Sequence, residues 1–105
     1  MISIERQQVE NELQKFVGEK VYVHSEATSY VFVRNFRMNL REARVAGGER
    51  GSYRVAFRFD EQGWLRMEGL THYEVDSEGH LLLAGYDDHG RMDVALHLGR
   101  EAFPE

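Results

Sequence analysis

Three tetrapeptides decide the fold: Asp60-Glu61-Gln62-Gly63, Asp76-Ser77-Glu78-Gly79 and Asp87-Asp88-His89-Gly90. Each separates two apolar runs, with Asp in first place and Gly in last. An Asp carboxylate accepts a hydrogen bond from the backbone N–H two residues on, and Gly tolerates the positive φ that often closes such a turn. Turns of this kind at short spacing join neighbouring strands into hairpins. The second half of the chain is therefore expected to form an antiparallel sheet.

Apolar and polar residues alternate around these turns, as in half-buried strands. The clearest strand has an inward face of Tyr53, Val55, Phe57 and Phe59 and an outward face of Arg54, Ala56 and Arg58. The same period of two recurs at residues 21–24, 30–37, 43–45, 65–67, 73–75, 81–83 and 92–98. This predicts a mainly β (α+β) fold, a meander of about seven strands forming a distorted sandwich or a partly open barrel. A chain of 105 residues corresponds to a single β-rich domain, 1–105.

One amphipathic helix is predicted at residues 4–17. Apolar side chains recur there at helical spacing, at Ile4, Val9, Leu13 and Phe16. Ser3 is expected to cap the start of the helix, and Gly18 to end it. Because a helix this short is marginal alone, its apolar stripe is expected to pack on the sheet.

Composition excludes several classes of protein. The net charge of −5, with basic residues interleaved among acidic ones, argues against nucleic-acid binding. The chain has no cysteine, which excludes disulfides and thiolate chemistry and fits a reducing compartment. The charged start of the chain does not resemble a signal peptide, and no segment approaches the roughly 20 apolar residues of a membrane span. We therefore expect a cytoplasmic protein without membrane association.

Histidine is the residue type that most invites a functional interpretation. The five are His24, His72, His80, His89 and His97. None of them stands at the short spacings of a zinc site, so no metal, other cofactor or catalytic residue is assigned, and solvated or singly hydrogen-bonded rings are favoured. His24 and Glu26 are two apart in a strand and should share a face. A carboxylate there orients an imidazole as a general base, but an exposed ion pair on a solvated sheet is the favoured alternative.

Two further segments supply tentative ligand-binding residues. Arg34 and Asn35 interrupt an apolar strand, so that Arg34 either snorkels to the surface or holds an anion. Glu68 and Thr71 flank Gly69, which suggests a β-bulge or a close backbone approach. The tentative site is therefore His24, Glu26, Arg34, Asn35, Glu68 and Thr71.

Several segments together resemble the YojF family, small uncharacterised proteins of Bacillus and its relatives. They are residues 21–28 (VYVHSEAT), 33–35 (VRN), 53–55 (YRV), 63–64 (GW), 68–73 (EGLTHY) and 82–85 (LLAG). The match runs in order over nearly the whole chain. The resemblance implies a β-rich fold with one N-terminal helix and no established activity. It also implies a neighbouring gene for a zinc-dependent sugar N-deacetylase of the kind used in bacillithiol synthesis, hence a helper role.

The resemblance also implies a longer polar loop between Thr28 and the Arg34-Asn35 strand than this chain has. One alternative is that a loop is missing between Tyr30 and Val31, which would separate their Cα atoms by more than one peptide can span. The other is that the hairpin is shortened in this protein.

Two functions follow from these observations. The leading hypothesis is a non-enzymatic binding module, expected to be a homodimer, that recognises a deacetylase-type protein partner or a small polar ligand. It rests on the lack of a complete catalytic set and on strands rich in aromatic and β-branched residues. The alternative is a small enzyme or metal-dependent ligand-binding protein that uses His24 and Glu26 with Arg34.

Overall fold

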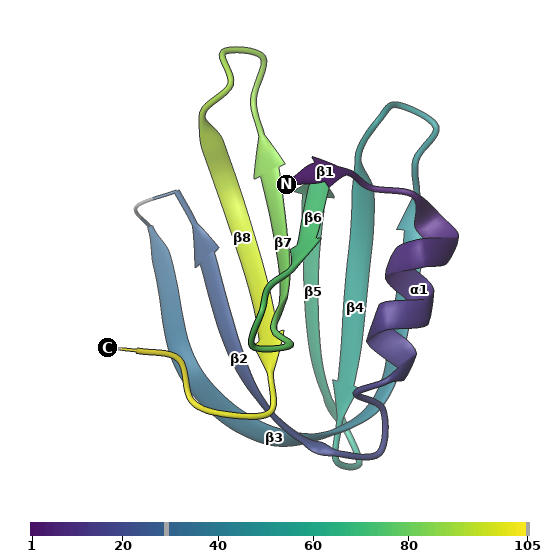
Figure 1. Cartoon of the computed structure of the whole chain (residues 1–105), viewed down its shortest axis with the longest axis vertical. Helices are drawn as coiled ribbons and strands as arrows, with labels where there is room; N and C mark the ends of the chain where they lie inside the picture. The colour runs from purple at the N-terminus through teal and green to yellow at the C-terminus, as the bar shows by residue number, and fades with distance from the viewer. Residues whose placement is uncertain (29, 105) are drawn as a thin grey trace.

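The computed structural model describes residues 1–28 and 30–104 and contains one helix and eight strands (Figure 1). The elements are β1 (Ile2–Ser3), α1 (Arg6–Gln14), β2 (Lys20–Ala27), β3 (Val31–Gly47), β4 (Tyr53–Phe59), β5 (Gly63–Leu70), β6 (His72–Val75), β7 (Leu81–Tyr86) and β8 (Met92–Gly99). The predicted mainly β fold with one N-terminal helix is confirmed. No helix in the described part of the chain is both long and apolar enough to cross a membrane.

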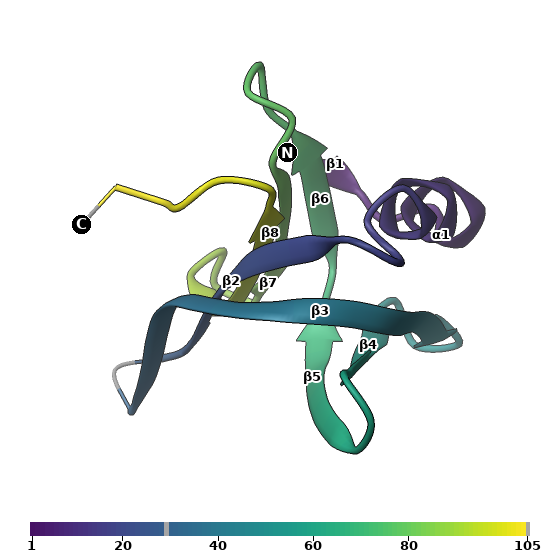
Figure 2. The same cartoon turned by 90° about the horizontal axis from the view of Figure 1, so that it is seen from below.

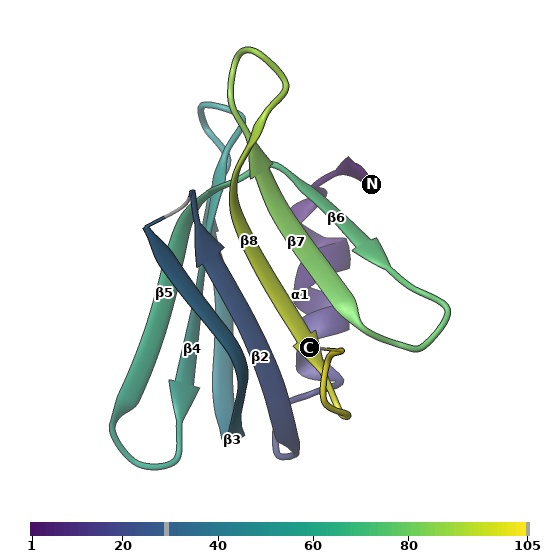
Figure 3. The ribbon, with the colours of Figure 1, turned by 90° about the vertical axis from the view of Figure 1, so that its left-hand side faces the viewer.

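All eight strands form one antiparallel sheet in the order β1-β6-β7-β8-β2-β3-β4-β5. The order contains two meanders, β2 to β5 and β6 to β8, which are joined because β8 pairs with β2. Figure 3 shows β2, β8 and β7 side by side. The sheet curls so far that β5 contacts β7 and β8, although it does not pair with them. The sheet is thus a partly open barrel rather than the single meander expected.

The long strand β3 belongs to both halves of the sheet. It curves beneath the molecule, pairing with β2 through its first half and with β4 through its second (Figures 1 and 2). The sequence predicted two separate strands here because the apolar parity changes, from Met38 and Leu40 to Ala43 and Val45. A register shift between Leu40 and Glu42 causes that change, so a bulge continues the strand where periodicity alone indicates a break.

The helix is shorter than predicted at both ends. Ser3 does not cap it, because Ser3 pairs with His72 in the sheet; the N-cap is Glu5, whose carboxylate accepts hydrogen bonds from the backbone N–H groups of Gln7 and Gln8. After Gln14 the chain continues in tight turns and reverses at Gly18, whose φ is +89°. The predicted stripe of Ile4, Val9, Leu13 and Phe16 is buried in the core, as expected.

The three turns and the face of β4 test the predicted register. Val55, Phe57 and Phe59 are buried and Tyr53 is half-buried, whereas Arg54 is exposed, so the assigned faces of β4 are confirmed. Asp76 and Asp87 each accept two backbone N–H groups across their turns, and Gly79 and Gly90 have positive φ. The first turn differs: Asp60 itself has a φ of +47°, and Gly63 is the first residue of β5. Val75 and Met92, at strand ends, are exposed rather than inward.

The hairpin from β2 to β3 is short. Ala27 pairs with Val31, and the Tyr30 N–H donates to the carbonyl of Ala27 at 3.1 Å. These contacts correspond to the shortened hairpin and not to a missing loop between Tyr30 and Val31. Thr28 has a φ of +52°, so residues 28–33 are not one continuous strand; Ser29 lies outside the described residues.

Candidate functional site

A β-bulge assembles the candidate site. Val23 pairs with Phe36 and Ser25 with Val33, so that two residues of β3, Arg34 and Asn35, lie opposite the single residue His24. Asn35 has a φ of +59°, a left-handed conformation that Asn tolerates better than most residues. Because a bulge redirects side chains, this one turns Arg34 toward His24 instead of leaving it in the regular alternation.

His24, Glu26 and Arg34 form one hydrogen-bonded group. The Arg34 Nε donates to His24 Nδ1 at 3.4 Å, and His24 Nε2 lies 3.2 Å from Glu26 Oε1. Since an arginine Nε–H is a donor only, Nδ1 of the neutral ring accepts and Nε2 carries the proton that is donated to Glu26. His24 and Glu26 therefore share a face as predicted. The expectation of an exposed pair is wrong, because the His24 side chain is only 3% exposed.

The C-terminal segment covers this group. Asn35 binds the backbone of Phe103 on both sides: its amide donates to the Phe103 carbonyl at 3.0 Å, and its carbonyl accepts from the Phe103 N–H at 2.7 Å. Arg34 donates to the Pro104 carbonyl at 2.6 Å. Figure 2 shows this segment leading away from the end of β8 toward the C-terminus. The bulge thus fastens the tail to the sheet.

The Phe103 side chain lies among three histidines. Its ring centroid is 4.7 Å from that of His80, 6.1 Å from that of His97 and 6.5 Å from that of His24. Sequence reasoning did not include His97 or Phe103 in the site. The sequence does indicate that His97 lies on the outer face of the sheet, because it stands between the buried residues Leu96 and Leu98. Its nearness to His24, however, depends on the pairing of β8 with β2.

His97 has a strongly altered titration. Burial is the main cause that lowers the pKa of His97 to about 4, and the nearby His24 and Arg34 lower it further, partly offset by Glu26. The imidazole of His97 is therefore neutral near pH 7, as is appropriate for a ring that packs in this aromatic cluster.

This pKa predicts that stability falls in mild acid. Between about pH 6.5 and pH 4 the unfolded chain, whose histidine pKa is near 6.5, binds more protons at residue 97 than the folded chain does. The contribution of neutral His97 to the stability of the fold is therefore complete above about pH 6.5 and is lost as the pH falls toward 4. Urea unfolding measures how much stability each protein loses between about pH 7 and pH 5. We expect this loss to be smaller in His97→Gln than in the wild type, by about 1–2 kcal/mol. Asp76 and Asp87, whose pKa values are also lowered, are present in both proteins and cancel in the difference. Equal acid sensitivity of the two proteins would contradict the prediction.

Glu68 and Thr71 make their contacts elsewhere. Glu68 pairs with Arg66 on β5 at 3.5 Å, and the Thr71 hydroxyl lies 2.7 Å from His72 Nδ1. Within residues 1–28 and 30–104, neither bonds to His24 or Glu26. The structure therefore brings together four of the six tentative site residues. The bulge expected at Gly69 is present, since Tyr53 pairs with Leu70 and Val55 with Met67.

In the part of the chain that the structure describes, one group of side chains that could bind a metal ion lies in the second Asp-x-x-Gly turn. Ligand atoms of Asp76, Glu78 and His80 lie within 4.8 Å of one another. Asp76 Oδ2 is already 2.8 Å from His80 Nδ1. Burial raises the pKa of Asp76, but hydrogen bonds from the backbone and ring of His80 outweigh it, so that the pKa is lowered overall. The Asp76 carboxylate therefore anchors both the turn and the His80 ring.

As arranged, the His24 group stabilises the tail rather than presenting reactive atoms. A general base must lie within hydrogen-bond reach of its substrate. His24 is covered edge-on by Phe32, with centroids 5.1 Å apart, and by His97 at the same distance. Chemistry at His24 would therefore require Phe32 or His97 to move aside.

The comparisons with known proteins agree with this architecture. The model of a family described as a protein of unknown function (DUF1806) matches residues 3–103. The uncharacterized protein YojF of Bacillus subtilis (strain 168) is 32% identical over 117 aligned positions, covering 98% of this chain and 98% of YojF. That alignment is 12 positions longer than this chain, in the direction expected for a longer loop in the relative. The crystal structure of Bacillus subtilis YojF superposes with a TM-score of 0.88 and 31% identity, covering 98% of this chain and 96% of that one. The chain therefore belongs to the DUF1806 family, as the resemblance to YojF indicated.

Proposed function

We propose that this protein is a non-enzymatic binding module that acts in the cytoplasm as a homodimer, and that it binds through the free edge of β3. The β3 edge is defined here as Val31–Met38. The observation that carries the proposal is that this edge combines unpaired backbone groups with exposed apolar side chains.

Among the described residues, the backbone of the β3 edge pairs with one strand, β2. Residues 31–39 pair with β2, whereas the pairing of β3 with β4 begins at Leu40. Figure 3 shows the first half of β3 beside β2, with β5 across a separate part of the curved sheet. A strand edge of this kind is a template for another strand, and natural proteins usually protect it. The bulge at Asn35 divides the edge into two short runs, which favours a partner that also contacts side chains.

Exposed apolar side chains cluster on and beside this edge. They are Tyr30 (90% exposed), Val31 (50%), Phe32 (63%), Val33 (37%) and Phe36 (52%). Single exposed apolar residues are ordinary, but Val31, Val33 and Phe36 share one face of β3, and a group of this kind marks an interaction surface. Next to it lies a hollow of about 530 Å³ between the edge and the turn from β4 to β5, lined in part by Phe36, Phe59 and Trp64. Apolar side chains from a partner would have a place to insert.

A second copy of the chain is the simplest partner for such a surface. Two identical edges can pair antiparallel about a two-fold axis, so that each apolar residue meets the same group on the other copy. This arrangement satisfies the free backbone groups and covers the apolar cluster at once.

The dimer can be tested by light scattering during size-exclusion chromatography at tens of micromolar protein. We expect twice the chain mass of 12.2 kDa for the wild type and the single chain mass for Val31→Lys/Val33→Lys, because charged edge residues oppose strand addition. The matched control is Val75→Lys/Met92→Lys, which adds the same charge at two exposed apolar residues of other strands and should remain dimeric. A wild-type monomer, or equal dissociation of both variants, would contradict the proposal.

We further propose an accessory role toward a deacetylase-type enzyme of the kind implied by the family resemblance. In the single chain the β3 edge is open and apolar, which supports a protein partner over a small polar ligand, so the enzyme would compete with the second copy of the chain for this edge. Titration of the purified zinc-dependent deacetylase with this protein, by calorimetry, tests the idea. Absence of heat for the wild type would contradict this part while leaving the dimer unaffected.

The alternative, an enzyme or metal-dependent ligand-binding protein built on His24, Glu26 and Arg34, has less support. The Arg34 guanidinium is already used by the Pro104 carbonyl, and His24 is covered. An anionic ligand would have to displace both contacts, so the binding module is the better account.

A further inference from the structure

The outer face of β3, β4 and β5 carries a symmetrical arrangement of arginines that neither the His24 group nor the β3 edge uses. The register of the three strands brings these arginines together, because Ala56 on β4 pairs with Arg44 on β3 and with Arg66 on β5. Along β4, the next outward residues on either side of Ala56 are Arg54 and Arg58. Four guanidinium-bearing side chains thus surround one methyl group. We call Arg44, Arg54, Arg58 and Arg66, with Ala56 and Trp64, the arginine face.

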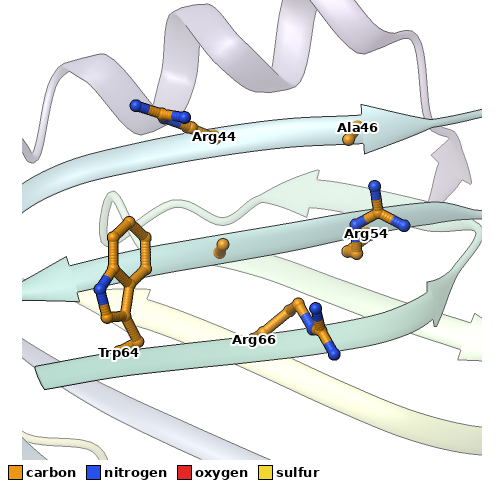
Figure 4. Close-up of a pocket in the computed structure, with 6 residues that line it drawn as sticks. Arg44, Ala46, Arg54, Trp64 and Arg66 are labelled. Atoms are coloured by element: carbon orange, nitrogen blue, oxygen red, sulfur yellow. The ribbon is translucent and has the colours of Figure 1, made fainter.

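The arginine face is hollow because small alanine side chains lie at its centre and long arginine and tryptophan side chains surround them. Arg44, Ala46, Arg54, Ala56, Trp64 and Arg66 line a depression of about 610 Å³. Figure 4 shows Trp64 standing at one end, Arg44 and Ala46 on the β3 side, and Arg54 and Arg66 toward the other end. In this view α1 lies beyond β3 and does not cover the hollow, and its residues Val9 and Leu13 are buried in the core of the protein.

The charge of the arginine face is opposite to that of the whole chain. Two acidic residues form ion pairs with these arginines in the described part of the chain: Glu42 with Arg44 and Arg58, and Glu68 with Arg66. A hydrogen bond from Arg58 is the main reason that the pKa of Glu42 is lowered, so Glu42 remains ionised. Arg54 forms no salt bridge among the described residues, and the side chains of Arg44 and Arg66 are 72% and 64% exposed. The face keeps excess positive charge on a chain whose net charge is −5.

We infer that the arginine face docks an acidic segment of another protein. Arginine forks bind carboxylates in bidentate pairs, and arginine and tryptophan are the residue types most enriched at binding hot spots. The contacts of Glu42 and Glu68 already show that carboxylates fit against these guanidinium groups. The alanine floor admits the backbone or short side chains of the docked segment, and Trp64 supplies apolar area.

An acidic segment fits better than a small anion or a nucleic acid. Sites for small ligands enclose most of the ligand and hold polar groups in place, whereas these walls are exposed, flexible side chains. A nucleic acid presents a long line of phosphates, which a chain with a net charge of −5 repels, whereas a docked segment meets only local charges within about 8–10 Å. Trp64 also lines the hollow beside the β3 edge, whereas the four arginines of the face do not, so the arginine variants test this surface apart from the dimer.

The test uses a fluorescein-labelled oligoglutamate of about ten residues as the probe, in about 50 mM salt, where surface attraction is weakly screened. We expect saturable anisotropy and a change in the emission of Trp64, which is the only tryptophan of the chain and lies at the face. Arg54→Gln/Arg66→Gln should weaken binding about tenfold or more. The matched control, Arg6→Gln/Arg91→Gln, removes the same charge from exposed arginines of α1 and the turn before β8, and should change binding less than about twofold.

Three results would overturn the inference. The first is no saturable binding of oligoglutamate by the wild type. The second is an equal loss in the face variant and the control, which would mean that net charge alone attracts the probe. The third is tighter binding of inorganic pyrophosphate or of an RNA oligonucleotide with the same Trp64 response, which would assign the face to another class of ligand.

Discussion

Leu13→Ala is expected to lower the free energy of unfolding by about 2–5 kcal/mol, because it empties a fully buried position between α1 and the sheet. Leu13 is 0% exposed, and the neighbouring Val9 and Phe16 are also buried in the core. The helix is only nine residues long, so packing rather than intrinsic helix propensity must hold it in place. Urea unfolding followed by circular dichroism measures the loss.

The control for Leu13→Ala lies on the same helix. Gln8 is exposed, and Gln8→Ala should change stability by no more than about 0.5 kcal/mol. A loss below about 0.5 kcal/mol for Leu13→Ala itself would show that the helix is not docked as described.

Gly85→Ala should cost about 3 kcal/mol or more, although it adds only one methyl group. A Cβ at Gly85 would lie 2.0 Å from the carbonyl oxygen of Gly69 and 2.7 Å from Val94 Cγ2. The first of these contacts is with backbone, so no side-chain rotation relieves it, and overpacking of this kind costs at the upper end of the usual range of about 1–3 kcal/mol. The methyl group would push β5 away from β7 where the curled sheet brings them together.

Gly63→Ala is the matched control. Its Cβ would meet only ordinary contacts, with Phe59 at 3.6 Å or more, and Gly63 is also the first residue of a strand rather than a turn position with positive φ. We expect it to be neutral or to stabilise by up to about 1 kcal/mol. Thermal unfolding should therefore separate the two variants by many degrees, and similar melting temperatures would refute the close approach of Gly69 and Gly85.

Local patterns predicted those parts of the fold that local physics determines. The alternation around Val55 and Phe57 identified a buried face, and the Asp76 and Asp87 turns are set by hydrogen bonds within a few residues. Gly69 was identified as a bulge, but the residue that it approaches, Gly85, has no signature in sequence. The merging of two expected strands into β3 was missed because the bulge near Arg41 reverses the apolar parity.

The candidate site shows the same division. His24 and Glu26 meet because they are two apart in one strand, which any reading of a period of two detects. His97 joins them only because β8 lies beside β2, and Phe103 only because Asn35 holds its backbone. Glu68 and Thr71 were grouped with His24 by their nearness to a glycine, but the order of the strands gives them other neighbours.

The pairing of β8 with β2 also sets the order in which the protein can fold during its synthesis. The hairpins β2–β3, β3–β4 and β4–β5 join neighbouring segments and can form as soon as each emerges from the ribosome. The pairing of β2 with β8, in which Tyr22 lies opposite Gly99, can form only after β8 has been synthesised. Until then β2 has an open edge on the nascent chain, and contacts this distant in sequence form slowly. The arrival of β8 is therefore the step that completes the sheet, and the interval before it is when an unfinished chain is most exposed to self-association.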